Sequence, residues 1–383
     1  MKQIMKILMV TFCMLNFSII IFSGILDEFV YILDPDQLLV SDEMALNVLG
    51  MYLKYYEDGN IQFKTIADQS RTHINLYLEP DDSTILDILG GYQKGNEKDT
   101  INKIEAALKK YPNSVVVNSI RVIFLFNEYK NTKDIEISKA ILSSLDIITK
   151  SKGENPFCVY YESIIRWDLS NDKEKEFIFS NLEKIFSFYS NNVKILELLI
   201  SKAFELSKYD KIIQLAQLYE KEPQKSETIL LLIAYSYNYS NEKEKARTIV
   251  DLLIQNSDKK NILSKSYELL GDISDTYTQK KKNYEISLYY DQKNEDSLAK
   301  LGLLLIQHDM KNNIGLSKIY LTKALIFDPD NEQIVNALKL VDHTLKKRNF
   351  IVTYLPLLII LVVILFILYK FLKEEKKIEN GQQ

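Results

Sequence analysis

Apolar residues along most of this chain recur at spacings of three and four between short polar breaks, a pattern typical of amphipathic helices. Strand-like alternation is not sustained anywhere. The helical segments come in pairs, for example residues 194–208 with 210–220, and residues 228–239 with 242–255. Joins as short as Ser240-Asn241 force consecutive helices to run antiparallel. The pattern therefore predicts an all-α chain built of helix hairpins.

Two of these pairs repeat at an offset of 34 residues. The corresponding apolar or small positions are Ala234, Ala246, Val250 and Leu253 in one pair, and Ile200, Ile212, Ala216 and Tyr219 in the other. Helices of one hairpin cross closely, so small residues are expected at the crossing, while larger apolar residues pack on the next hairpin. A non-repeating helical bundle is the alternative. Several matched units in series favour a repeat.

The matched units resemble the tetratricopeptide-repeat (TPR) family. The resemblance rests on Leu301-Gly302, Ala324 and Asp328-Pro329-Asp330-Asn331 near the end of the repeat region, and on Leu270-Gly271, Leu89-Gly90, Tyr111-Pro112-Asn113 and Leu49-Gly50 upstream. It implies an α-solenoid of about eight antiparallel hairpins over residues 27–348. Residues 331–348 would form a capping helix, and residues 310–315 a turn longer than the family norm. The match is poorest over residues 114–191.

An uninterrupted apolar run, residues 350–369, follows the repeats. At 1.5 Å per residue, a helix of this length spans about 30 Å, the hydrocarbon thickness of a bilayer. Tyr354 and Tyr369 lie near its ends, where aromatic rings favour the membrane interface. The run predicts a transmembrane helix over residues 349–371, followed by a short charged tail, residues 372–383.

The N-terminus also has an apolar run, residues 7–22, which begins after Lys2 and Lys6 and ends before Asp27 and Glu28. This layout predicts that residues 1–26 form a signal peptide or an uncleaved signal anchor, and both interpretations stay open. The residues before Cys13 do not form a lipobox, so Cys13 is interpreted as a small apolar residue of this segment.

Charge predicts the orientation of the chain. The N-terminal lysines favour an inside N-terminus, which places the repeat domain outside the cytoplasm, in the periplasm, and the C-terminal tail inside. Lys370, Lys373, Lys376 and Lys377 in the tail support this orientation. The cluster Lys346-Lys347-Arg348 on the other side of the apolar run opposes it.

Composition and motifs argue against most chemistry. The formal net charge is −4, so no basic nucleic-acid-binding face is expected. His73, His308 and His343 are far apart and lack partners at metal-ligand spacing. Gly90 to Asn96 is rich in glycine, but it is not followed by the Lys-Ser/Thr pair of a phosphate-binding loop. Outside the leader Cys158 is the sole cysteine, which rules out a disulfide within the repeat region. No cofactor, metal or catalytic residue is predicted.

The resemblance to TPR proteins also implies where a partner would bind. In that family the groove-facing positions lie early and midway along the first helix of each hairpin. Carried onto this sequence, they are Lys194, Glu197, Ser201 and Phe204 in one unit, Thr228, Leu231, Tyr235 and Asn238 in the next, and Ala299, Leu303 and Ile306 in the last. The family's carboxylate clamp of Asn, Lys and Arg is not reproduced.

These features predict a non-enzymatic scaffold or adaptor, with a protein partner in the solenoid groove and the C-terminal helix in a membrane, as in a bacterial cell-envelope complex. Two alternatives belong to other classes. One is a murein-cleaving enzyme on a helical solenoid, which would need a catalytic acid in a substrate-binding domain. The other is a structural protein that self-associates, although residues 350–369 have no small-xxx-small face for tight helix pairing.

Overall fold

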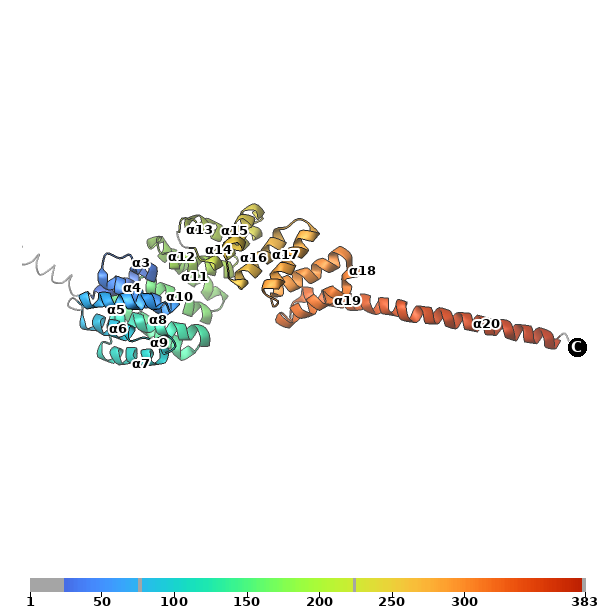
Figure 1. Ribbon diagram of the computed structural model, residues 1–383, viewed down its shortest axis with the longest axis horizontal. Coiled ribbons are helices and arrows are strands. Elements are labelled where there is room, and N and C mark those ends of the chain that lie inside the picture. Colours follow the sequence, from blue (N-terminus) through green and yellow to red (C-terminus); the bar gives the residue numbers. More distant parts are fainter. Residues whose placement is uncertain (1–23, 75–77, 223–224, 381–383) are drawn as a thin grey trace, which may run out of the picture. The chain divides into compact units, whose positions relative to one another are not determined.

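The computed structural model describes residues 24–74, 78–222 and 225–380, and within these ranges every regular element is a helix. The chain divides into two compact units, one up to Gln224 and one from Lys225. Each unit is a series of antiparallel hairpins (Figure 1). The predicted all-α fold is therefore confirmed. The leader prediction falls almost entirely on residues 1–23, which lie outside the described residues.

Five hairpins make up the first unit. They are α4 (Met44–Asp58) with α5 (Ile61–Ile74), α6 (Pro80–Gly90) with α7 (Glu97–Lys110), α8 (Val115–Thr132) with α9 (Ile135–Lys152), α10 (Pro156–Leu169) with α11 (Asp172–Phe188), and α12 (Val193–Glu205) with α13 (Tyr209–Tyr219). Short polar residues begin many of these helices. Asn171 closes a capping box with Glu174, and the side chains of Asn155 and Asn192 accept hydrogen bonds from backbone amides in the first turns of α10 and α12.

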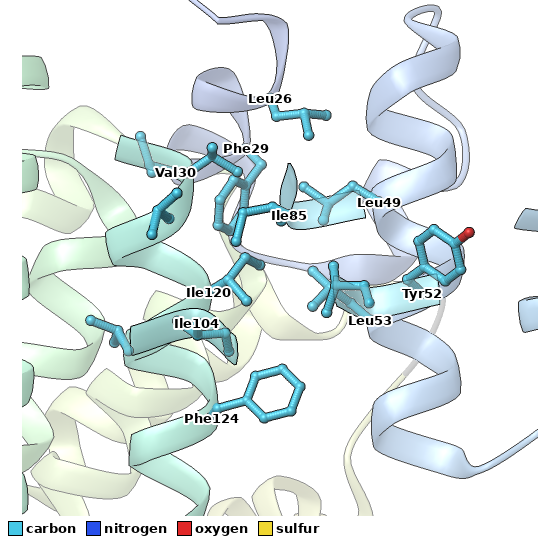
Figure 2. Close-up of a cluster of buried hydrophobic side chains, with 14 of the residues drawn as sticks. Leu26, Phe29, Val30, Leu49, Tyr52, Leu53, Ile85, Ile104, Ile120 and Phe124 are labelled. Atoms are coloured by element: carbon cyan, nitrogen blue, oxygen red, sulfur yellow. The ribbon is translucent and has the colours of Figure 1, made fainter. Parts of the chain in front are cut away.

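An N-terminal strap precedes these hairpins and contributes to their core. It consists of η1 (Ile25–Glu28), α2 (Phe29–Ile32) and α3 (Pro35–Leu38). Leu26, Phe29 and Val30 are fully buried beside residues of α4, α6, α7 and α8 (Figure 2). The apolar side chains of the strap therefore pack against several hairpins at once, and their burial stabilises the first unit as a whole.

Polar contacts hold the strap along one edge of the first unit. The Tyr31 hydroxyl donates to the carbonyl of Lys152 at 2.9 Å, and the Asn192 side-chain amide donates to the carbonyl of Ile32 at 3.2 Å. The Lys152 ammonium lies 3.4 Å from the Asp27 carboxylate. These partners belong to the end of α9 and the start of α12, so the strap crosses helix ends that are distant in sequence.

The second unit begins with α14 (Glu227–Tyr239) and α15 (Lys243–Asn256), followed by α16 (Lys260–Ile273) and α17 (Tyr277–Tyr290). Next come α18 (Glu295–Phe327) and α19 (Glu332–Asn349). A π-helical turn, η2 (Phe350–Tyr354), joins α19 to α20 (Leu355–Asn380), and Figure 1 shows this as one continuing helix. With the two halves of α18 taken as one pair, eight hairpins lie in the described residues, the number that the sequence predicted.

The 34-residue register is confirmed at the level of packing. All eight matched positions are buried: Ala234, Ala246, Val250 and Leu253 in α14 and α15, and Ile200, Ile212, Ala216 and Tyr219 in α12 and α13. Glycines mark other close crossings. A methyl group at Gly302 would lie 2.7 Å from Cγ of Leu321, so the two halves of α18 can approach only because Gly302 has no side chain.

The prediction of a turn over residues 310–315 is wrong, because these residues are helical. The backbone breaks at Asp309, where φ is −154° and ψ is 87°, and helix resumes directly after it. The Asp309 carboxylate accepts hydrogen bonds from the backbone amide and the side-chain amide of Asn312. Asp309 therefore caps the second half of α18, which shortens the turn to a kink.

The described residues contain one helix that is long and apolar enough to cross a membrane. Its apolar stretch lies within η2 and α20, and its large apolar side chains are between 45% and 68% exposed. No described part of the chain covers them. A helix that is apolar on every side is stable in water only when it is buried, so this stretch needs an apolar environment.

Candidate functional site

The first helices of four hairpins in the first unit surround a small cavity of about 160 Å³, which we call the aromatic pocket. Helices α4, α8, α10 and α12 supply most of its lining, and the strap closes one side. The lining residues are Leu33, Pro35, Leu53, Tyr56, Glu57, Ile123, Phe126, Asn127, Lys130, Tyr160, Tyr161 and Lys194. In a repeat of hairpins this is the face where first helices line up, so the pocket lies on the face predicted to hold a partner.

Aromatic rings form the walls. Tyr161 packs edge-on against Phe126, with ring centroids 4.9 Å apart, and against Tyr160 at 5.1 Å. The Tyr56 ring lies 4.3 Å from that of Phe124. The Tyr56 hydroxyl is buried and interacts with the Asn127 side chain, but no described residue makes a hydrogen bond of normal geometry with it. A buried hydroxyl without a well-formed hydrogen bond is unfavourable, so this group can still bond to a polar atom that enters the pocket.

The charged groups at the pocket are unbalanced. Glu57 lies 3.7 Å from Lys54 and also interacts electrostatically with Lys194, while the Lys130 ammonium lies 5.6 Å from the centroid of the Phe126 ring. Among the described residues, neither Lys130 nor Lys194 forms an ion pair within 4 Å. The lining itself holds two ammonium groups and one carboxylate, a net charge of +1. Burial raises the pKa of Tyr160 to about 12, with smaller contributions from Glu197 and Glu57, so its hydroxyl stays protonated at neutral pH. The pocket therefore offers cationic and hydroxyl donors beside aromatic surfaces.

The four groove positions predicted on α12 have different environments. Lys194 lines the aromatic pocket. Glu197 accepts a hydrogen bond from the Tyr219 hydroxyl at 2.7 Å, which ties α12 to α13. Ser201 is half-buried, and the half-buried ring of Phe204 packs edge-on against Tyr209. Of these four, Lys194 is the one that lines the aromatic pocket.

The four positions predicted on α14 belong to the second unit. Thr228 is exposed and Asn238 is half-buried. Leu231 is buried and packs with Leu253 and Ile262, so its side chain belongs to the contact between hairpins. Tyr235 donates a hydrogen bond to the Glu268 carboxylate at 3.1 Å. Ala299, Leu303 and Ile306 on α18 are half-buried and pack against the core of the last hairpin.

Tyr235 is part of an ion-pair network on the first helices of the second unit. Glu268 on α16 is 1% exposed, and its carboxylate lies 2.6 Å from the Lys300 ammonium and 3.1 Å from that of Lys265. Lys300 also lies 2.7 Å from Asp272. Burial alone would lower the pKa of Lys300, but Glu268 and Asp272 raise it above its usual value. The carboxylates and ammonium groups of this network are paired with one another, whereas the lysines that line the aromatic pocket form no close ion pair in the described part of the chain.

Reasoning from the sequence missed the aromatic pocket except for Lys194. Lys130, Tyr160 and Tyr161 lie within residues 114–191, where the repeat match is poorest, and Tyr56 follows the matched Leu49-Gly50 but was not assigned to the groove. The adjacent pair Tyr160-Tyr161 was a usable signal, because two neighbouring helical residues point about 100° apart, so the two rings reach different neighbours, and both line the pocket.

Potential metal ligands are scattered in the described part of the chain. No group of three or more His, Cys, Asp or Glu side chains could hold a metal ion there. His308 stacks on Tyr277 with ring centroids 3.5 Å apart. Cys158 is buried and unpaired.

No family model and no curated protein matches the sequence. Several solved structures superpose on it. A tetratricopeptide repeat protein from Parabacteroides merdae is 13% identical, with 68% of this chain and 98% of that chain covered at a TM-score of 0.48. The P58(IPK) TPR domain is 11% identical, with 81% of each chain covered at 0.38. The human IFIT1 dimer with PPP-AAAA is 13% identical, with 82% and 75% covered at 0.41.

The first two of these are TPR proteins by description, the family that the sequence resembles. At such identities and TM-scores, no partner or activity is transferred to this chain. The fold assignment rests on the chain's own antiparallel hairpins and their buried 34-residue register.

Proposed function

We propose that this protein is a non-enzymatic, membrane-anchored scaffold that holds a protein partner at the aromatic pocket of its first unit. The observation that carries the proposal is the combination of aromatic walls with the lysines Lys130 and Lys194, which form no ion pair within 4 Å among the described residues and leave the lining with a net charge of +1. Aromatic and cationic side chains around a small cavity are typical of the few residues that dominate binding at protein interfaces.

The size and charge of the pocket indicate what enters it. A cavity of about 160 Å³ accommodates one side chain of a partner, whereas pockets for cofactors and drug-sized ligands usually measure about 300–1,000 Å³. The net positive lining favours a segment that places a carboxylate beside an apolar side chain. We therefore infer that the partner is a protein segment, with no role for nucleic acid, metal or cofactor.

The membrane anchor is the second part of the proposal. The exposed apolar stretch of residues 350–369 would cross the bilayer, and the lysines that follow it would lie on the cytoplasmic side. The repeat units would then face the periplasm or its equivalent, where a scaffold could organise a cell-envelope complex. The leader would be either removed or retained as a second membrane helix.

Partner binding is tested by capture of the full chain from detergent-solubilised membranes, followed by mass spectrometry. The variant carries Lys130→Glu and Lys194→Glu together. The control, Lys139→Glu, reverses the charge of an exposed residue of α9 that is not part of the pocket. We expect the wild type and the control to recover the same companion proteins and the double variant to lose them. Equal recovery by all three proteins, or no companion for the wild type, would exclude the pocket as the partner site.

Membrane attachment and orientation need separate measurements. After alkaline carbonate extraction, the full chain is expected in the membrane pellet, and a chain truncated after Arg348 in the supernatant. Protease is then added to cells whose outer barrier alone has been opened. Digestion of the repeat units under this condition supports the extracytoplasmic orientation. If the repeat units resist digestion until the inner membrane is also opened, they lie on the cytoplasmic side, and the proposed orientation is wrong.

A further inference from the structure

A second and larger cavity, of about 520 Å³, lies in the first unit where α10 meets α9 and α11, and we call it the α10 groove. Val159, Ser163 and Arg166 recur along α10 at spacings of three and four, so they form one stripe of that helix and contribute to the lining. Tyr160 and Tyr161, which line the aromatic pocket, point away from this stripe. The two cavities therefore lie on different faces of α10.

The α10 groove exposes large apolar side chains. Phe177 on α11 is 68% exposed and Leu169 at the end of α10 is 55% exposed, and both line the groove. Ile178, which is buried, also contributes to the lining of the groove, and most of the Phe177 side chain is left uncovered by the described residues. Phe177 and Leu169 therefore present apolar surface that the apolar side chains of a partner could bury. It lies within residues 114–191, where the sequence departs from the repeat pattern.

Carboxylates frame this apolar surface. Glu154 precedes α10 and Glu174 lies in the first turn of α11, beyond the other end of α10. Between them Glu162 pairs with Arg166 at 2.6 Å. Three carboxylates and one guanidinium give the lining a net charge of −2. With 14 residues in α10, the framed surface is about 21 Å long, close to four helical turns.

We propose that the α10 groove docks an amphipathic basic helix of a second protein. The apolar stripe of that helix would cover Phe177 and Leu169, and its Lys or Arg side chains would lie against Glu154 and Glu174. Helices of about four turns that present residues at i, i+3, i+4 and i+7 suit grooves of this length. This surface is distinct from the aromatic pocket, and the inference does not rest on the proposed function.

The charge of the groove argues against two other occupants. In a symmetric dimer built on this groove, two identical acidic rims would face each other, and like charges repel. An anionic membrane surface would be repelled for the same reason. A basic segment of a different protein is the occupant whose charge complements Glu154 and Glu174.

The test places the photo-crosslinking residue p-benzoylphenylalanine at position 177 of the full chain, in the membranes where the protein is produced. Phe188 is the matched control, because it lies on the same helix, is 71% exposed and is not part of the groove. The crosslinked peptides are then sequenced. The expected result is one segment of another protein with an apolar helical stripe and flanking Lys or Arg, captured from position 177 and not from position 188.

A second variant combines Glu154→Gln and Glu174→Gln. Gln keeps the capping box of α11, because a glutamine side chain can make the same bond to the N-cap backbone, so the fold is preserved. Crosslinking from position 177 is expected to fall about three- to tenfold with two charge pairs removed. Crosslinks to this chain's own peptides, to lipid, to an acidic segment, or to nothing would overturn the proposal, as would an unchanged yield in the glutamine variant. Lys130 and Lys194 are intact in these experiments, so the result is independent of the pocket test.

Discussion

Replacing Lys300 with methionine is the sharpest test of the ion-pair network in the second unit. Methionine keeps an unbranched apolar side chain but removes the ammonium group that lies 2.6 Å from Glu268 and 2.7 Å from Asp272. Glu268 is 1% exposed, so water cannot replace the lost partner. Tyr235 and Lys265 still contact its carboxylate, at 3.1 Å in each case.

Removal of one partner from a buried ion pair destabilises a protein by about 3–5 kcal/mol, because the other charge stays buried. We expect the lower end, about 3 kcal/mol, since Lys265 remains and Lys300 is itself one-third exposed. If the loss of stability comes from the Glu268 charge that is left buried without Lys300, then adding Glu268→Gln should restore at least half of that loss. Two separate deletions without such a link would instead add their losses.

The measurement is hydrogen exchange by mass spectrometry on the full chain in detergent, read from peptides of α16 and of the first half of α18. Lys318→Met is the matched control, because the Lys318–Asp342 pair has a similar distance of 2.7 Å but both side chains are nearly half exposed. We expect the control to change local stability by less than about 1 kcal/mol. Equal effects of the two variants, or no recovery in the double variant, would refute the reasoning.

Three further predictions concern other parts of the chain. Burial raises the pKa of Asp82 to about 7, so its contribution to stability is present below its unfolded pKa near 3.8 and is lost as pH rises to 7. Asp82→Asn should therefore remove a decline of roughly 1.4 kcal/mol per pH unit in that window from urea unfolding curves, and an unchanged decline would contradict it. A methyl group at Gly271 would lie 2.4 Å from a buried tyrosine ring, so Gly271→Ala should destabilise by about 1–3 kcal/mol, whereas Gly315→Ala, with open space around it, should not. Ile360→Asp, with a penalty of about 3 kcal/mol at the centre of a bilayer, should shift the chain toward the carbonate supernatant, and full retention in the pellet would count against the anchor.

Much of the fold could be predicted from local patterns. Spacings of three and four indicate helices, short polar joins indicate hairpins, and the 34-residue offset places Ala234 and Ala246 at helix crossings, where both are buried. These features depend on neighbours within one or two helices, so the sequence carries them directly. The kink at Asp309 was missed because a single side chain capping its own turn replaced the longer loop that spacing alone suggested.

The candidate site was far less predictable. Among the eight groove positions on α12 and α14, Lys194 reaches the aromatic pocket, Leu231 is buried between hairpins and Tyr235 is bonded to Glu268. Such differences arise because equivalent positions of degenerate repeats meet different neighbours. The family pattern identifies a face of each hairpin, and it does not identify which side chains on that face remain unpaired.

The sequence by itself thus determined the helices, their pairing, the repeat register and the apolar stretch at residues 350–369, because each is a periodic or compositional property of a short segment. Tertiary structure alone decided where the strap lies, that Glu57 and Lys194 share one pocket although 137 positions separate them, and that Phe177 is left uncovered beside α10. Those outcomes depend on how hairpins stack, and stacking follows from side-chain shapes at many crossings together, which no single segment encodes.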